Sequence, residues 1–311
     1  MIIDAHCHLV DEKWLPRKWW EGVAKVAIPV LKKMGMAEVT VSQVIEQIMP
    51  GLYFDPTGEK QLAAMDEAGI DRAVILPLDY GLPIGEAPVP IEEVNETFAD
   101  LQKRHPDRFI AFVSVDPRRR GAADLVRRAL DDWGMRGLKL HPGSGFFPNG
   151  KETRRLLKKI ADYKIPVICH TGAILQPLYS KGCDPLWLDE LCADFPDQIV
   201  VAAHLGHGYG RELNHLGACK TNLWTDISDL QRRASHEFRY FCESLRGALD
   251  SFGPDRVLFG TDGPYLRPVL SDRDYVQLVK DLPFKAPEGI SFTNEEVEAI
   301  LGGNAARLYN L

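Results

Sequence analysis

The sequence predicts one α/β domain, a (β/α)8 TIM barrel that spans residues 1–311. Short runs rich in Ile and Val, each ending in a polar residue, alternate with longer amphipathic stretches, which is typical of a parallel sheet with crossover helices. The 311 residues suit a barrel, which often forms a single domain of about 250 residues or more. With 45% hydrophobic and 26% charged residues, the chain has the composition of a globular protein with a sizeable core.

Eight apolar runs are the predicted strands. An open doubly wound sheet is the main alternative, but it usually carries a Gly-rich phosphate loop after its first strand, and none follows here. In chain order the predicted strands are Ile2–Ala5, Ala73–Pro77, Phe109–Val115, Gly137–Leu140, Pro166–Cys169, Ile199–Ala203, Leu223–Ile227 and Val257–Gly260.

The stretches between the strands have apolar residues at spacings near three and four, as helices packed on a sheet require. The tail from Thr293 to Leu311 is predicted to be a closing helix with Thr293 as its N-cap. The other predicted helices are Glu59–Ala68, Ile91–Arg104, Ala122–Asp132, Lys151–Tyr163, Leu186–Phe195 and Glu237–Ser251.

Residues 9–57 form a long insertion after the first strand, and it contains Trp14, Trp19, Trp20 and Tyr53. The loops that follow barrel strands lie over the active-site face, so we interpret the insertion as a partial lid. A packing appendage at the barrel bottom, or a dimer interface, is the open alternative, because aromatic residues also dominate ordinary interfaces.

Charge and composition limit the kinds of partner that the protein is expected to bind. A net charge of −7 and a pI near 5.8 argue against nucleic acid, which needs a concentrated basic surface. No apolar stretch reaches the roughly 18 residues of a membrane span, and the N-terminus lacks a signal-peptide pattern, so we expect a cytoplasmic protein. The six cysteines have no CxxC spacing and are expected to be reduced thiols.

Side chains able to bind metals follow three of the predicted strands. His6 and His8 follow the first strand, His170 the fifth and Asp262 the eighth. A closed barrel brings the C-terminal ends of its strands to one mouth, so these groups become neighbours. His6 and His8 are two positions apart, and side chains at this spacing in an extended segment point the same way. Three imidazoles and one carboxylate form a common zinc site, which keeps a position open for water or substrate.

Each of these residues also has an ordinary structural explanation. Asp262 precedes Gly263 and Pro264 and could shape a turn, and His170 could be a hydrogen-bonded core residue. An isolated HxH pair is weak evidence for a metal. The prediction depends on all four residues meeting at one barrel mouth.

Five motifs resemble the metal-dependent amidohydrolase superfamily, and within it the amidohydrolase-related group with the aminocarboxymuconate-semialdehyde decarboxylase-like enzymes. They occur in the family's order across nearly the whole chain. The motifs are IIDAHCH at 2–8, GLKLHP at 137–142, VICHTG at 167–172, AHLG at 203–206 and LFGTD at 258–262.

This resemblance implies that His6, His8, His170 and Asp262 hold one divalent metal, expected to be zinc with manganese as the alternative. His204 corresponds to the histidine that orients water or the scissile group, or binds a second metal in some relatives. We expect a single metal, because the decarboxylase-like group is mononuclear.

The role of Lys139 after the fourth strand stays open: a carboxylated bridge between two metals, a cation facing the substrate, or an interior residue paired with a carboxylate. His141 and Arg267 are further candidates for substrate contact, and Arg211 is, like Arg267, a candidate to bind a substrate carboxylate. Local capping or surface roles are the alternative for these residues and for His207. Barrels of this group commonly pair, so a homodimer is an open alternative to a monomer.

The expected function is hydrolysis of an amide, ester or lactone bond of a small molecule by metal-activated water, with Asp262 and His204 as the catalytic residues. The alternative is non-oxidative decarboxylation of an unsaturated or aromatic acid, in which an arginine would hold a carboxylate. A catalytically inactive binding protein on the same barrel is the third reading, because a fold alone does not prove a function.

Overall fold

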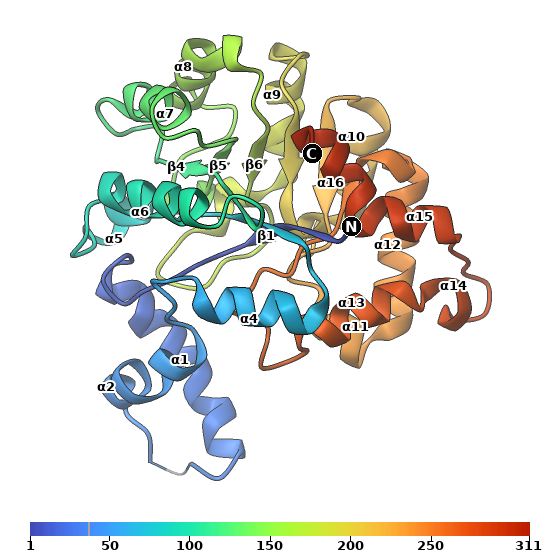
Figure 1. The fold of residues 1–311 in the computed structure, drawn as a ribbon, viewed down its shortest axis with the longest axis horizontal. Coiled ribbons are helices and arrows are strands. Elements are labelled where there is room, and N and C mark those ends of the chain that lie inside the picture. The colour runs from blue at the N-terminus through green and yellow to red at the C-terminus, as the bar shows by residue number, and fades with distance from the viewer. Residues whose placement is uncertain (37) are drawn as a thin grey trace.

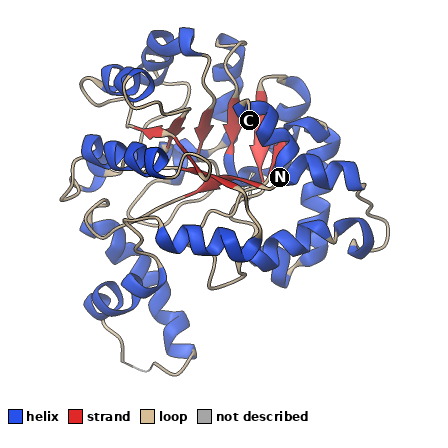
Figure 2. Ribbon diagram, viewed as in Figure 1, coloured by secondary structure: helices blue, strands red, loops and turns tan. Residues whose placement is uncertain are grey.

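The computed structural model describes residues 1–36 and 38–311, and the chain folds as the predicted (β/α)8 barrel (Figure 1). Figure 2 shows the strands in the interior and the helices around them. All paired strands are parallel, in the orders β1-β2-β3 and β4-β5-β6-β7-β8-β9. The strands are β1 (Ile3–Cys7), β2 (Arg72–Ile75), β3 (Phe109–Ala111), β4 (Val113–Ser114), β5 (Leu138–Leu140), β6 (Val167–Cys169), β7 (Val200–Ala202), β8 (Leu223–Asp226) and β9 (Val257–Leu258).

Strands β3 and β4 are two halves of one barrel strand that is interrupted at Phe112. The Phe112 N–H donates to the carbonyl of Ile75 on β2 at 3.2 Å, whereas the Val113 N–H donates to the carbonyl of Gly137 before β5 at 2.9 Å. The backbone therefore changes partner within one continuous strand. The predicted strand Phe109–Val115 is confirmed, and eight barrel strands result.

Backbone hydrogen bonds also join the first strand to the last. The Ala5 N–H donates to the carbonyl of Phe259, and the Asp262 N–H donates to the carbonyl of His6, both at 2.8 Å. The segment that continues β9 thus lies beside β1. This junction closes the ring.

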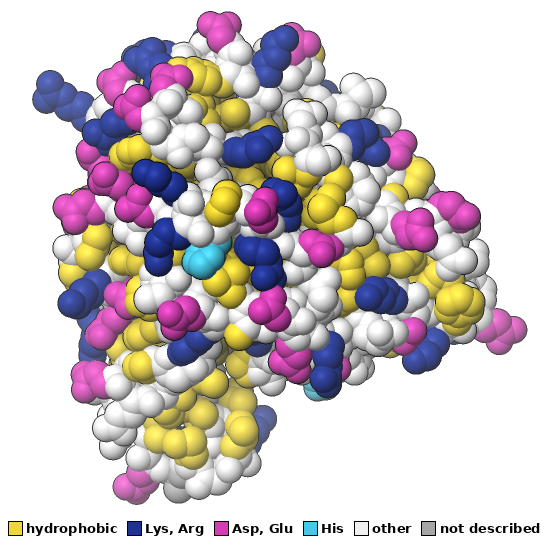
Figure 3. Space-filling model, viewed as in Figure 1, with side chains coloured by type: hydrophobic (Ala, Val, Ile, Leu, Met, Phe, Trp, Pro, Cys, Tyr) yellow, Lys and Arg dark blue, Asp and Glu magenta, His cyan; other side chains and the backbone are white. Residues whose placement is uncertain are grey.

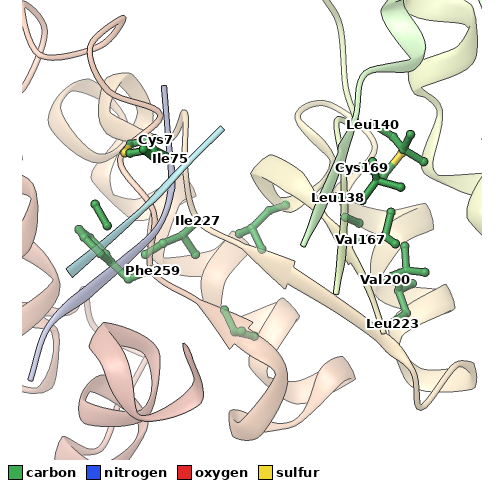
Figure 4. Close-up of a cluster of buried hydrophobic side chains, with 14 of the residues drawn as sticks. Cys7, Ile75, Leu138, Leu140, Val167, Cys169, Val200, Leu223, Ile227 and Phe259 are labelled. Atoms are coloured by element: carbon green, nitrogen blue, oxygen red, sulfur yellow. The ribbon is translucent and has the colours of Figure 1, made fainter. Parts of the chain in front are cut away.

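Successive side chains along each strand point alternately into the barrel and outward to the helices, which gives the protein an inner and an outer core. On β2, Val74 belongs to a cluster inside the barrel, together with Tyr309 of the C-terminal helix, while Ile75 packs outward on the helices. Figure 4 shows outward side chains from several strands, among them Ile75, Val167 and Leu223. Burial of both faces explains why the strands are continuous apolar runs.

The predicted helices are confirmed, and Glu59–Ala68 and Ile91–Arg104 have the predicted bounds. The Thr293 hydroxyl accepts the Glu296 N–H at 3.2 Å, which confirms the predicted N-cap. The helices are α1 (Arg17–Lys33), α2 (Val41–Gln43), α3 (Met49–Leu52), α4 (Glu59–Ala68), α5 (Gly81–Ile84), α6 (Ile91–Arg104), α7 (Ala122–Asp131), α8 (Lys151–Ile160), α9 (Leu188–Asp194), α10 (Gly210–Cys219), α11 (Gln231–His236), α12 (Phe238–Phe252), α13 (Asp272–Lys280), α14 (Leu282–Lys285), α15 (Asn294–Glu298) and α16 (Asn304–Tyr309).

The insertion after β1 folds into helices α1, α2 and α3, of which α1 and α2 project away from the ring of barrel helices (Figure 1). Its aromatic side chains share a buried cluster with loops at the C-terminal ends of the strands. Trp19 and Trp20 belong to this cluster with Tyr80 after β2, Leu178 after β6 and Tyr265 after β9. The described part of the insertion therefore packs at the barrel mouth, and its action as a lid stays a prediction.

Gly22 of α1 is a close contact between the insertion and the barrel. A methyl group added there would lie 2.1 Å from the carbonyl oxygen of Gln176, in the loop after β6. We expect Gly22→Ala to destabilise the docked insertion by about 1–3 kcal/mol, the usual cost of overpacking. Thermal unfolding and the rate of proteolysis within residues 9–57 measure this effect.

Gly51→Ala in α3 is the matched control, because nothing lies within 4 Å of the methyl group that it would add. Both substitutions gain the same helical propensity, so their difference isolates the contact with Gln176. Equal stability of the two variants would contradict the close packing.

The outer surface carries mixed charge. Figure 3 shows basic and acidic side chains interspersed on the face in view. Within the described ranges, no helix combines the length and the hydropathy that crossing a membrane requires.

Candidate metal centre

The structure brings His6, His8 and Asp262 together at the mouth of the barrel. Asp262 Oδ1 lies 3.5 Å from His6 Nε2 and 3.3 Å from His8 Nε2. One ligand atom from each of the three residues lies within 4.8 Å of the others. Two imidazoles and a carboxylate, supplied by both ends of the chain, therefore point to a common centre.

The strand register explains how both histidines reach it. The pairing of β1 with β2 shifts between Asp4 and Cys7, which marks a local irregularity just where His6 lies. Cys7 packs outward into the core between strands and helices, whereas His6 and His8 face the Asp262 side chain. Irregularities of this kind re-aim side chains and are frequent beside active sites.

Asp262 is held by a strained but well-supported backbone. Its φ of +51° is left-handed, a region that non-glycine residues seldom adopt. The Asp4 carboxylate accepts the Thr261 N–H at 3.0 Å and the Thr261 hydroxyl at 2.5 Å. The Thr261 hydroxyl oxygen in turn accepts the Gly263 N–H at 3.0 Å. These bonds on both sides of Asp262 fix its direction, as expected where strain is retained for function.

Hydrogen bonds orient the two histidine rings. His6 Nδ1 lies 2.8 Å from Asp226 Oδ2, and His8 Nδ1 donates to the carbonyl of Leu76 at 2.7 Å. In both rings Nδ1 is occupied, so Nε2 is the nitrogen that remains for a metal. Ligating histidines commonly donate their other N–H to a carboxylate or a backbone carbonyl in this way.

His170, the fourth predicted ligand, lies beside His204 with its Nδ1 at 3.1 Å from His204 Nε2. Its Nε2 is buried and has no hydrogen-bond partner. His170 is not part of the compact group formed by His6, His8 and Asp262. A buried nitrogen without a hydrogen-bond partner is rare in proteins. The lone pair of His170 Nε2 is therefore suited to bind a metal ion.

Burial sets the protonation of these rings. It lowers the pKa of His6, of His170 and of His204 well below the usual value. Neighbouring positive charge, such as Lys139 beside His6, acts in the same direction. These imidazoles are therefore neutral at physiological pH, which is the form that binds a metal.

Lys139 lies inside the site. Its Nζ is 2.9 Å from His6 Nε2, and its side chain is fully buried. Burial lowers the pKa of Lys139 to about 8, although the charges of Asp262 and Asp226 oppose the shift. The amine thus contacts the candidate ligand nitrogen of His6, and its three predicted roles stay open.

His204 takes part in a hydrogen-bonded group with two residues that the sequence did not single out, Asp226 and Ser228. Its backbone N–H donates to Asp226 Oδ1 at 2.9 Å, and its Nδ1 lies 2.8 Å from the Ser228 hydroxyl, which also donates to Asp226. His6, His204 and Asp226 form a second group of converging ligand atoms. Asp226 ends an apolar strand, and this signal, already used for His170, could have identified it.

His141 stacks on His170 with ring centroids 4.1 Å apart, so it lies beside the candidate site, and its contact with a substrate stays a prediction. The Arg267 guanidinium, in contrast, is bound to Asp272 at 2.8 Å and to Gln61. His207 Nδ1 lies 2.6 Å from Asp229 Oδ2. Arg211 is exposed on α10.

The chain is similar in sequence to known proteins. The amidohydrolase family profile matches residues 3–311. Protein fluG of Emericella nidulans is 26% identical over 170 residues, which is 52% of this chain and 19% of fluG. The chain thus corresponds to less than a fifth of that protein's length.

Solved structures with the same fold include enzymes of two reaction classes. A 5-carboxyvanillate decarboxylase from Novosphingobium aromaticivorans, complexed with manganese, has 16% identity and a TM-score of 0.68 over 100% of this chain and 96% of that one. A probable 2-pyrone-4,6-dicarboxylic acid hydrolase from Acinetobacter baumannii has 14% identity and a TM-score of 0.66 over 100% and 99%. An amidohydrolase from Burkholderia multivorans with bound zinc has 17% identity and a TM-score of 0.68 over 100% and 99%.

Proposed function

This chain belongs to the amidohydrolase family, and we propose that it hydrolyses an amide, ester or lactone bond of a small molecule at a one-metal site. The observation that carries the proposal is the approach of His6 Nε2 and His8 Nε2 to Asp262 Oδ1. The chain is an enzyme of the amidohydrolase superfamily, so the reading as an inactive binding protein is set aside.

The residues present fit a divalent metal. His6, His8 and Asp262 would hold it, with His170 supplying its orphaned Nε2. We expect zinc, with manganese as the alternative, because imidazole nitrogen and carboxylate oxygen suit both. When bound, the ion would polarise a carbonyl group and lower the pKa of a bound water to about 7.

The protein's own groups account for proton transfer. The Asp262 side chain is 14% exposed whereas that of His6 is fully buried, so the carboxylate is the part of the centre open to water and substrate. Asp262 would take a proton from the attacking water and deliver it to the leaving group, directly or by way of His204. Asp226 and Ser228 hold the His204 ring in place for this role.

Decarboxylation is the second candidate, and the rings around the centre favour it. His141 stacks on His170, and its ring centroid lies 4.8 Å from that of Tyr80 in an edge-to-face contact, so the surroundings of the centre are aromatic. Decarboxylation also calls for an arginine that binds the substrate carboxylate, but the Arg267 guanidinium is bound to Asp272 instead. Hydrolysis therefore remains the first proposal.

A substrate panel distinguishes the two reactions. Protein purified without chelator and loaded with zinc or manganese would be incubated with lactones, amides, esters and aromatic carboxylic acids, and both hydrolysis and CO2 release would be followed. We expect metal-dependent hydrolysis of at least one lactone, amide or ester and no CO2 release. CO2 release from an aromatic acid without hydrolysis would establish the lyase instead, and inactivity of fully metal-loaded protein on the whole panel would contradict both.

A further inference from the structure

The Arg267 guanidinium lies against the turn that carries Asp262. A methyl group added at Gly263, the next residue, would lie 2.9 Å from Arg267 Nη2 and 3.3 Å from its Cζ. The side chain of Arg267 is 20% exposed, so most of it is enclosed by protein. The charged group of this arginine therefore packs on the backbone of the candidate metal centre.

Gly263 joins the two segments that supply metal ligands. Its carbonyl accepts the His8 N–H at 2.7 Å, and the Tyr265 N–H donates to the carbonyl of Asp262 at 3.3 Å. Asp262 has a left-handed backbone, and a strained turn keeps its shape only while its surroundings hold it. A group that packs on Gly263 can therefore act on His8 and on Asp262 together.

Two buried side chains hold the guanidinium in this place. Arg267 Nε donates to Asp272 Oδ2 at 2.8 Å, and Arg267 Nη2 donates to Gln61 Oε1. The Asp272 side chain is 2% exposed, and Gln61 is 1% exposed. A carboxylate buried to this degree needs a positive partner, and an arginine with two fixed acceptors has little freedom to turn toward a substrate.

The two acceptors come from neighbouring barrel helices. Gln61 belongs to α4 and Asp272 begins α13, and these helices pack on each other (Figure 1). The Gln61 N–H also donates to Asp55 Oδ2 at 2.8 Å, which fixes the first turn of α4. Arg267 thus connects the Asp262 turn to the helical wall of the barrel.

We propose that Arg267 is a positioning residue, which holds the Asp262 turn in the geometry that metal binding requires, and that it does not bind the substrate. It acts through the backbone, because the guanidinium packs on Gly263, and Gly263 keeps Asp262 and His8 directed at one point. The effect on catalysis rests on the proposed function, whereas the effect on metal affinity needs no reaction.

Arg267→Met and Gln61→Met test the proposal through zinc affinity, measured by competition with a chromophoric chelator. Arg267→Met removes the guanidinium, and we expect the affinity to fall by about tenfold or more, as for the loss of other groups that orient a ligand. Gln61→Met removes one anchor and keeps the ion pair, so we expect a fall of about threefold or more, as the loss of one hydrogen bond predicts. Arg267→Lys keeps the charge without the planar fork and should have an intermediate affinity.

Arg246→Met is the matched control. The Arg246 side chain is 25% exposed, and it pairs with the Glu296 carboxylate at 2.9 Å between α12 and α15. Its loss should leave zinc affinity within about twofold, because distant sites act independently.

Two further measurements separate positioning from general stability and from substrate binding. The visible spectrum of cobalt-loaded Arg267→Met should differ from that of the unmodified protein, because the ligands no longer meet in the same geometry, whereas that of Arg246→Met should be unchanged. With a substrate found in the panel, kcat of Arg267→Met at saturating zinc should fall while KM stays unchanged. A residue that binds a substrate carboxylate would instead raise KM.

Three results would overturn the proposal. They are an unchanged zinc affinity in folded Arg267→Met and Gln61→Met, an equal loss of affinity in Arg246→Met, and a raised KM with unchanged zinc affinity. If Arg267→Met does not fold, Gln61→Met and Arg267→Lys decide by the same criterion. Absence of hydrolysis by zinc-loaded protein would overturn the proposed function alone, since the zinc and cobalt measurements still decide the role of Arg267.

Discussion

Replacing His6 and His8 by alanine should empty the metal centre. The double variant keeps only Asp262 of the compact group, and its metal content should fall from about one ion per chain to less than about a tenth of that. Hydrolytic activity should fall by a factor of about 10³ or more, because water activation and carbonyl polarisation are both lost. Elemental analysis of protein purified without chelator, together with steady-state kinetics, measures both effects.

His236→Ala is the matched control for this experiment. His236 is an exposed imidazole at the end of α11, and its Nδ1 bonds only to Ser235 and the Arg232 carbonyl. This variant should retain its metal and its activity. If the double variant kept full metal content with a native circular dichroism spectrum, the assignment of the ligands would be wrong.

Asp262→Asn is expected to have the second large effect. The amide keeps the shape of the carboxylate but cannot accept a proton from water, so kcat should fall by about 10²–10⁴-fold, the usual contribution of a general base. The amide is also a weaker ligand, so zinc affinity should fall as well. Measuring kcat at saturating zinc separates the two contributions.

A surface carboxylate provides the comparison for Asp262. Asp281 follows α13 and bonds to Lys285 and Gln277 at the surface, and Asp281→Asn should leave kcat within about twofold. If Asp262→Asn, loaded with zinc, retained more than about a third of the unmodified kcat, Asp262 would not be the base. His204 would then be the next residue to test.

The sequence predicts the barrel because strand burial on both faces gives a strong local signal. Runs such as Val167–Cys169 are continuously apolar, and the helices between them carry a regular apolar face. The helices of the insertion were not predicted, although the apolar residues of α1 recur at helical spacing from Trp20 through Val23, Ala24, Ala27 and Ile28 to Leu31. Periodicity does not report the partner of this face, which is formed by loops after β2, β6 and β9.

The sequence likewise predicts one part of the candidate site and not the other. His6, His8 and Asp262 follow strand ends, and the rule that strand ends meet at one mouth was enough to place them together. Asp226 also lies at a strand end but was not predicted, because it acts through another residue: its carboxylate binds the His6 ring. The pairing of Arg267 with Asp272 depends on rotamers and loop paths, which no pattern of spacing reveals.

The ring closure between β1 and the segment after β9 has a consequence for biosynthesis. His6 leaves the ribosome well before Asp262, so the nascent protein passes through a stage with an unsealed sheet. During that stage β1 presents an unpaired edge together with two free imidazoles, a combination open to misassembly and to adventitious cations. Completion of the last strand removes both hazards in one event.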